Sequence, residues 1–294
     1  MLDSVASEWI AAATIFVIGF LSRLVIQAIL RRNRDAFSML TGLGPAKSEF
    51  HLVFGLVDST VKPGNRYAEE GDVSALTAAT LLLASSTAEK NLRVINARSA
   101  LPVFRGFERL LSISGPVWNP VTKALMASAG FEAGFSTRPV PPGEDNDTLV
   151  YPTDDGTAEV FTTRQNGIPR ECYCLVICSE YDVPNSRRTQ RTAVVAGIST
   201  LGTYGGLYWL RGLSHKNWSD VFDTKFEDDM ARCIVLRVQD RSPDGFFAYA
   251  SMSSTPGFIT VDMIALFERP RHAPKGQSRR VDVARWMARI GPGR

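Results

Sequence analysis

Three times along this 294-residue chain, a short apolar strand is expected to run through a glycine-containing loop into a helix. In the clearest case, residues 193–196 form the strand, the loop begins at Gly197, and an aromatic and aliphatic helix ends before a C-cap at Gly212. Valine-rich runs favour strands, and glycine commonly terminates helices. Repeated alternation of strands and helices predicts an α/β fold with a parallel or mixed sheet.

The other two units lie earlier in the chain. Residues 50–57 predict a strand, followed by a polar loop and a helix over residues 73–84 with Asp72 as N-cap. Residues 107–114 predict a second strand, whose loop leads to a helix over residues 121–129. Asn119, Pro120 and Gly130 supply an N-cap, a first helical residue and a C-cap for that helix.

Beyond residue 137 the composition shifts towards proline and acidic residues, and short strands are expected on both sides of Asp154-Asp155-Gly156, a hairpin turn signal. Residues 172–181 predict a strand that pairs antiparallel with 193–196. The predicted fold class is therefore α/β, a Rossmann-like mixed sheet with an antiparallel β insertion, preceded by one N-terminal transmembrane helix. The expected segments are an anchor (1–34), a linker (35–48), a ligand-binding domain (49–268) and a basic tail (269–294).

The transmembrane prediction depends on residues 9–30, an apolar run that is long enough to cross a bilayer as a helix. Arg31, Arg32 and Arg34 follow it, while Asp3 and Glu8 precede it. The positive-inside rule then predicts a single pass through the inner (plasma) membrane, with the N-terminus outside and the C-terminal domain in the cytoplasm.

Arg23 complicates this anchor, because a charge inside a membrane span costs a few kcal/mol, about 3 on insertion scales. Its side chain would have to snorkel to the interface or contact another helix in a homo-oligomer. The alternatives to a span are an amphipathic helix lying on the bilayer and a core helix docked on the domain.

Composition narrows the range of partners and cofactors. The net charge is only +3, and no basic stripe interleaved with aromatics occurs, which argues against nucleic acid. Cys172, Cys174 and Cys178 would face one side of a strand, either as small buried residues or as part of a metal site. Their spacing lacks the usual Cys-x-x-Cys pattern, so we predict no metal, and the sequence identifies no cofactor.

Loops that follow parallel strands gather at the carboxyl edge of the sheet, where ligands bind at a crossover in strand order. A helix N-terminus there favours a phosphate. We therefore predict a ligand cleft for a nucleotide-like small molecule. Its expected ligand-binding residues are Ser199, Thr200, Gly202, Thr203, Tyr204, Gly205, Gly115, Asn119 and Arg66.

The loop residues also allow other interpretations. The glycines match neither the P-loop nor the dinucleotide fingerprint, and they equally suit tight turns and close helix–strand packing. Ser199 lacks the following glycine of a nucleophile elbow. Asp58 and Asp72 are candidate catalytic acid–base residues of a hydrolase or transferase, although acidic loops are commonly just solvated.

The segments SGPVWNPVTKALM and VVAGISTLGTYGGLYWL resemble parts of Rossmann-like domains in bacterial proteins, including nucleotide-sensing modules of defence systems. The resemblance covers residues 50–213 and implies nucleotide-type ligand binding with signalling to a membrane segment, and it implies no catalytic residue. Three hypotheses follow: a membrane-anchored ligand sensor or effector, a membrane-tethered hydrolase or transferase, and a non-catalytic scaffold or interaction protein.

Overall fold

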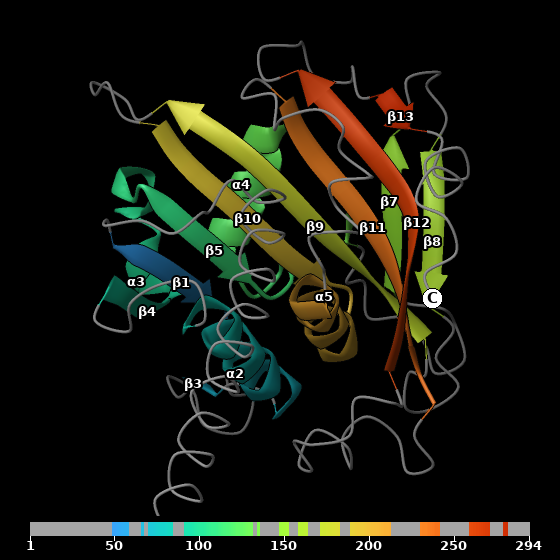
Figure 1. The fold of residues 1–294 in the computed structure, drawn as a ribbon, viewed down its shortest axis with the longest axis horizontal. Helices are drawn as coiled ribbons and strands as arrows, with labels where there is room; N and C mark the ends of the chain where they lie inside the picture. The colour runs from blue at the N-terminus through green and yellow to red at the C-terminus, as the bar shows by residue number, and fades with distance from the viewer. Residues whose placement is uncertain are drawn as a thin grey trace, which may run out of the picture.

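A mixed eight-stranded sheet forms the centre of the molecule, with helices on both of its faces (Figure 1). Its strand order is β13-β12-β11-β9-β10-β5-β1-β4. The computed structural model describes residues 49–58, 66–67, 70–84, 91–131, 134–135, 147–152, 158–163, 171–182, 189–212, 230–241, 259–270 and 279–281. The predicted α/β class with a mixed sheet is confirmed.

One half of the sheet is parallel, and we call it the parallel half. Its strands, in spatial order, are β4 (Leu92–Asn96), β1 (Phe50–Phe54), β5 (Arg109–Ile113) and β10 (Thr189–Gly197). The first predicted strand is shorter than expected, because β1 ends at Phe54 and Gly55 and Leu56 interrupt the ladder.

The antiparallel half continues from β10. Its strands are β9 (Glu171–Asp182), β11 (Met230–Asp240), β12 (Ile259–Pro270) and β13 (Arg279–Val281). The antiparallel pairing expected between the two central strands is confirmed by β9 and β10. Strand β13 lies within residues 269–294, where a loose basic tail was expected, and it pairs with β12.

Two small sheets accompany the main one. β2 (Val57–Asp58) pairs antiparallel with β3 (Arg66–Tyr67) directly after β1. β6 (Gly134–Phe135), β7 (Asp147–Pro152) and β8 (Ala158–Thr163) form a three-stranded antiparallel sheet between α4 and β9 in the chain. This second sheet matches the expected antiparallel segment and its hairpin.

Four helices cover the two faces of the main sheet. α2 (Glu70–Ala84) and α5 (Thr200–Gly212) pack on one face, and α3 (Ala97–Ala100) and α4 (Pro120–Ala129) pack on the other, with a 3-10 turn at Phe104–Gly106. Side chains alternate between faces along each strand, so each strand supplies both cores. Leu52 and Val195 face α2 and α5, whereas Val53 and Val194 face α3 and α4.

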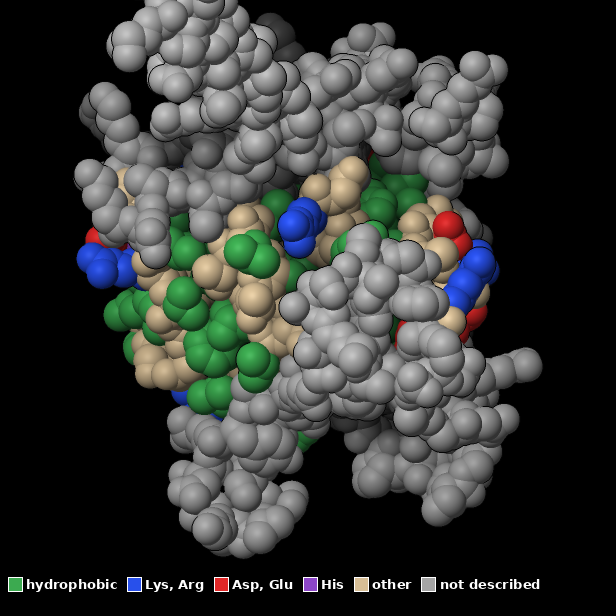
Figure 2. Space-filling model, turned by 60° about the horizontal axis from the view of Figure 1, so that its bottom comes forward, with side chains coloured by type: hydrophobic (Ala, Val, Ile, Leu, Met, Phe, Trp, Pro, Cys, Tyr) green, Lys and Arg blue, Asp and Glu red, His purple; other side chains and the backbone are tan. Residues whose placement is uncertain are grey.

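Helix α2 begins earlier than its sequence suggests. It starts at Glu70, so Asp72 lies in its first turn and the expected N-cap role of Asp72 is wrong. Val73 and Leu81 of α2 are exposed. Figure 2 brings the α2 and α5 end of the molecule forward and shows hydrophobic side chains on that face, with charged side chains mostly towards its rims.

Helix α4 matches its sequence signals closely. Asn119 is its N-cap, Pro120 is its first residue, and Gly130 is its C-cap with φ +74°. Glycine tolerates this left-handed conformation without steric cost. A Cβ atom at Gly130 would also collide with the guanidinium group of Arg269, so this position requires glycine for two reasons.

Several predicted segments lie outside the described residues. They include the anchor and linker (1–48). Among the helices that the structure describes, none combines the length and apolarity needed to span a membrane. The transmembrane prediction for residues 9–30 therefore stays a prediction.

Candidate functional site

The loops that follow β1, β5 and β10 touch one another at the carboxyl edge of the parallel half. A Cβ atom added at Gly55 would lie 3.1 Å from the carbonyl oxygen of Trp118 and 3.2 Å from the Cβ atom of Ser114. A Cβ atom added at Gly115 would lie 3.1 Å from the carbonyl oxygen of Gly197. Three segments far apart in the chain thus form one continuous edge.

This edge coincides with a reversal in strand order. From β1 the chain passes through α2 to β4 on one side, and it then returns to β5 on the other side of β1. Because α2 and α4 pack on opposite faces, the chain leaves the neighbouring ends of β1 and β5 towards opposite faces of the sheet. In open α/β sheets, ligands bind outside the carboxyl ends of the strands at such a switch point.

Ser114, the residue that follows β5, adopts an unusual backbone conformation at this switch point. Its φ is +83°, and it is the only non-glycine residue with positive φ in the part of the chain that the structure describes. The left-handed region costs an L-residue about 1–2 kcal/mol. Ser114 is 3% exposed, and its Oγ atom has no hydrogen-bond partner among the described residues. A strained residue with an unsatisfied hydroxyl is a recognised indicator of function.

The loop between β5 and α4 is held by Asn119, which is fully buried. Its Nδ2 atom donates to Ser112 Oγ (3.0 Å) and to the carbonyl oxygen of Ile113 (2.7 Å), while its Oδ1 atom accepts from the Thr122 amide (3.0 Å). Both ends of the amide are therefore engaged within the protein. Asn119, a predicted ligand residue, fixes the loop that the site uses.

The polar groups of the loop between β10 and α5 make fewer hydrogen bonds than those of the loop between β5 and α4. The Thr203 amide donates to the carbonyl oxygen of Ser199 (3.1 Å), so the amides of residues 200–202 precede the first intrahelical bond. Ser199 Oγ is buried and has no hydrogen-bond partner within the described part of the chain. Unlike α4, helix α5 thus starts without a side-chain cap from its preceding serine.

Thr203 has a structural role in the same loop. Its Oγ1 atom accepts a hydrogen bond from the Gly197 amide (3.1 Å) and donates to the carbonyl oxygen of Ser199 (3.4 Å). The residue is 1% exposed. Its hydroxyl therefore closes the turn between β10 and α5 instead of facing a ligand.

Three further predicted ligand residues belong to the body of α5. A Cβ atom at Gly202 would lie 2.6 Å from the carbonyl oxygen of Tyr173, and one at Gly205 would lie 2.3 Å from a Val238 methyl group. Tyr204 packs against the core shared by α2 and α5. These glycines allow α5 to approach the sheet, as the packing interpretation of the sequence expected.

Of the predicted ligand residues, Ser199, Thr200 and Gly115 lie at the edge itself. Asp58 and Arg66 are Cα partners in the β2–β3 ladder, which begins just beyond Gly55. Asp72 lies in the first turn of α2. The catalytic role suggested for Asp58 and Asp72 stays a prediction.

Sequence reasoning did not single out Gly55, Ser114 or Trp118. Gly55 follows β1 directly, and the close approach of Trp118 to it depends on pairing between β1 and β5. Ser114 precedes Gly115-Pro116, a turn signal, but nothing in the sequence indicates which residue takes positive φ. Trp118 is notable because its side chain is 47% exposed on this edge.

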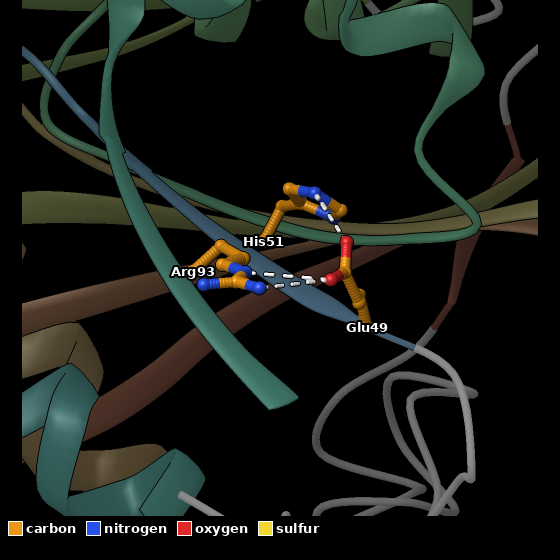
Figure 3. Close-up of polar contacts among 3 residues, drawn as sticks. All are labelled: Glu49, His51 and Arg93. Carbon is orange, nitrogen blue, oxygen red and sulfur yellow. Dashed lines mark hydrogen bonds and ion pairs between the residues drawn. The ribbon is translucent and has the colours of Figure 1, made fainter. Parts of the chain in front are cut away.

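A different set of polar residues lies at the opposite end of β1. Figure 3 shows Glu49 between His51 and Arg93. The Glu49 carboxylate lies 3.8 Å from His51 Nε2 and 3.3 Å from an Arg93 guanidinium nitrogen. The His51 ring stacks on Phe107 with centroids 3.7 Å apart. Burial lowers the pKa of His51, and Glu49 partly opposes this shift.

The cysteines are buried on both faces of the sheet. Cys172, Cys174 and Cys178 face α2 and α5 on β9, as their even spacing predicted, while Cys233 faces the other core. Burial raises the pKa of Cys178 to about 12. Thiols that are this hard to ionise are poor nucleophiles. Within the described residues, no three His, Cys, Asp or Glu side chains are grouped to hold a metal ion.

Comparison with known proteins adds no relative. No protein-family model matches the chain, no curated protein is significantly similar to it, and no solved structure matches its fold.

Proposed function

We propose that this protein is a membrane-anchored ligand sensor or effector whose Rossmann-like domain binds a phosphate-bearing, nucleotide-like small molecule. The site is the switch point formed by the loops after β1, β5 and β10. The observation that carries the proposal is the pair of buried serine hydroxyls, Ser114 and Ser199, that lack partners among the described residues on this edge.

Phosphate is the group that suits these features. The amides at the start of α5 and the positive end of its dipole favour an anion. Serine hydroxyls donate readily to phosphate oxygens, and such hydrogen bonds are stronger than those between neutral groups. Asn119 and Thr203 hold the two loops in place through bonds that a ligand does not need to replace.

The connection to the anchor supports a sensor role. The segment that contains the predicted membrane span leads directly into Glu49 and β1. Because β1 ends at Phe54, next to Gly55 at the proposed site, one five-residue strand connects the predicted anchor side of the domain to the ligand side. A shift at that edge on ligand binding would be transmitted along β1 towards an oligomerising span.

Isothermal titration of the full-length chain with ATP, ADP, AMP and pyrophosphate tests the proposal. We expect at least the diphosphate-bearing compounds to bind and to raise the melting temperature. Ser114→Ala and Ser199→Ala should each weaken binding roughly tenfold, the value of one hydrogen bond to a charged group. Neither change should lower stability much, because neither Oγ atom bonds a described residue.

Ser112→Ala is the matched control. The Ser112 hydroxyl is bonded to Thr122 Oγ1 (2.8 Å) and to Asn119, so its loss should lower stability and not act on the ligand directly. A chain that binds none of the four compounds, or that binds them equally well after both Ser114→Ala and Ser199→Ala, would rule out the proposed site.

A further inference from the structure

Trp118 is an exposed aromatic residue on a fixed backbone. Its side chain is 47% exposed, and its neighbour Val117 is 43% exposed. The Trp118 amide donates to the carbonyl oxygen of Gly115 (3.3 Å), and the next residue is the buried N-cap Asn119. The loop therefore holds the position of a large apolar ring that the protein core does not cover.

The loop also limits the distance between the Trp118 backbone and the proposed phosphate position. Gly115, at one end of the turn, contacts Gly197 in the loop that starts α5. Trp118, at the other end, contacts Gly55 after β1. Residues joined by such a turn have Cα atoms within about 7 Å of each other. A ligand that spans the turn would thus place an anionic end near α5 and another group near Trp118.

We infer that the Trp118 indole stacks against the aromatic base of the bound ligand. This inference rests on the proposed function and narrows its ligand to nucleotides, as opposed to sugar phosphates or inorganic phosphates. Every nucleobase offers a π-face, so stacking selects for the presence of a base and tolerates its identity.

Two other described aromatic residues on α5 do not suit this role. Tyr204, one of the predicted ligand-binding residues, packs against the core, and so does Trp209 on the same helix. Val117 is exposed on the same loop but lacks a π-face. The stacking position therefore belongs to Trp118, and Val117 provides a natural control.

Titration of the full-length chain with ADP, ribose 5-phosphate and pyrophosphate tests this inference. In the wild-type protein, ADP should bind more tightly than the two compounds without a base. Trp118→Leu should weaken ADP binding about 5- to 150-fold, the range for loss of one base–aromatic stack. It should leave the affinity for pyrophosphate unchanged. Trp118→Phe should retain most of the ADP affinity, and Val117→Ala should retain all of it.

The outcomes separate this inference from the proposed function. If pyrophosphate binds in every variant and Trp118→Leu weakens ADP no more than Val117→Ala does, the stacking role is wrong while the phosphate site stands. If no compound binds the wild-type chain, both are wrong. Melting temperatures show whether Trp118→Leu has lost its fold. If it has, the decisive comparison is between Trp118→Phe and Val117→Ala. An ADP affinity of Trp118→Phe far below that of Val117→Ala would then overturn the stacking role of Trp118.

Discussion

The two halves of the sheet differ in what their strand ends do. In the parallel half, β1 and β5 are five residues long, and both end in loops at one edge. In the antiparallel half, β9 and β12 are each 12 residues long, and successive strands run in opposite directions. Parallel strands bring all their carboxyl ends together, whereas antiparallel strands distribute them over two edges. Only the parallel half is able to gather three loops into one site.

The difference extends to polar groups. On the parallel half, Ser114 combines positive φ with an unsatisfied hydroxyl. On the antiparallel half, β9 buries its thiols on one face and aliphatic side chains on both, and the buried Arg232 on β11 is paired with Glu268 on β12 (2.9 Å). This half also has a buried hydroxyl without a partner among the described residues, Thr260 Oγ1, but none of its described non-glycine residues has a positive φ. The parallel half thus carries local backbone strain at the proposed site, while the strands of both halves contribute to the two cores.

Helix α5 connects the two halves. It starts at the end of β10, on the proposed site, yet its glycines lie against Tyr173 of β9 and Val238 of β11. The position of α5 therefore depends on the antiparallel half as well as on its connection to β10. Substitutions at Asn119, Gly202 and His51 test this division between the two halves.

The parallel edge should depend most strongly on Asn119. Asn119→Ala removes the N-cap of α4, together with the hydrogen bonds of Asn119 to the Thr122 amide, to Ser112 Oγ and to the Ile113 carbonyl oxygen. We expect a loss of about 2–4 kcal/mol in the free energy of unfolding, measured by urea denaturation. The control is Asn96→Ala, which removes the more exposed N-cap of α3 and should cost about 1 kcal/mol. Equal losses of unfolding free energy in the two variants would show that burial of Asn119 adds nothing to the stability that an N-cap provides.

Close packing against the antiparallel half should limit which side chains α5 accepts at its glycine positions. Gly202→Ala would place a Cβ atom 2.6 Å from the Tyr173 carbonyl oxygen, a backbone atom with little freedom to move. We expect a net loss of about 1–3 kcal/mol, even though alanine favours helices. Gly212→Ala at the end of the same helix meets nothing within 4 Å and should be neutral or stabilising in thermal unfolding. A stable Gly202→Ala protein would mean that α5 does not depend on the sheet for its position.

The smallest effect should come from His51, at the end of the parallel half away from the site. Burial lowers its folded-state pKa below its usual value of 6.5, so the unfolded chain binds the proton more readily. The wild-type protein should therefore lose stability as the pH falls below about 6.5, relative to His51→Phe, which keeps the stack on Phe107.

The neighbouring charges refine this test. Glu49 favours the protonated imidazole and Arg93 disfavours it. Glu49→Gln should accordingly enlarge the loss of stability between pH 7.5 and pH 5.5 in urea denaturation. A stability difference between wild type and His51→Phe that does not change with pH would contradict the assignment.

Local signals in the sequence predicted the elements that depend on local interactions. Helix α4 is the clearest case, because Asn119, Pro120 and Gly130 act through bonds and dihedral angles within a few residues. The paired strands β9 and β10 and the shared face of Cys172, Cys174 and Cys178 also follow from residue spacing. The gathering of loops at one edge follows from parallel pairing.

Features that depend on tertiary contacts escaped prediction. No sequence signal near Gly202 or Gly205 indicates that Tyr173 and Val238 lie against them. From the sequence, both glycines were therefore as compatible with ligand binding as with close packing of the helix on the sheet. Ser114, which has the positive φ, lies against Gly55, 59 positions earlier in the chain. The N-cap expected at Asp72 failed because α2 continues for two further residues towards its N-terminus.

The central position of β10 has a consequence for how the protein is made. β10 pairs with β5 on one side, where Thr192 lies opposite Leu110, and with β9 on the other. Pairings between residues so distant in sequence form slowly, because a long loop must close first. A ribosome that has reached residue 188 has produced β1, β4 and β5 but not the strand that carries the third loop. The edge proposed to bind the ligand is thus assembled late, only after the insertion β6–β8 has been synthesised.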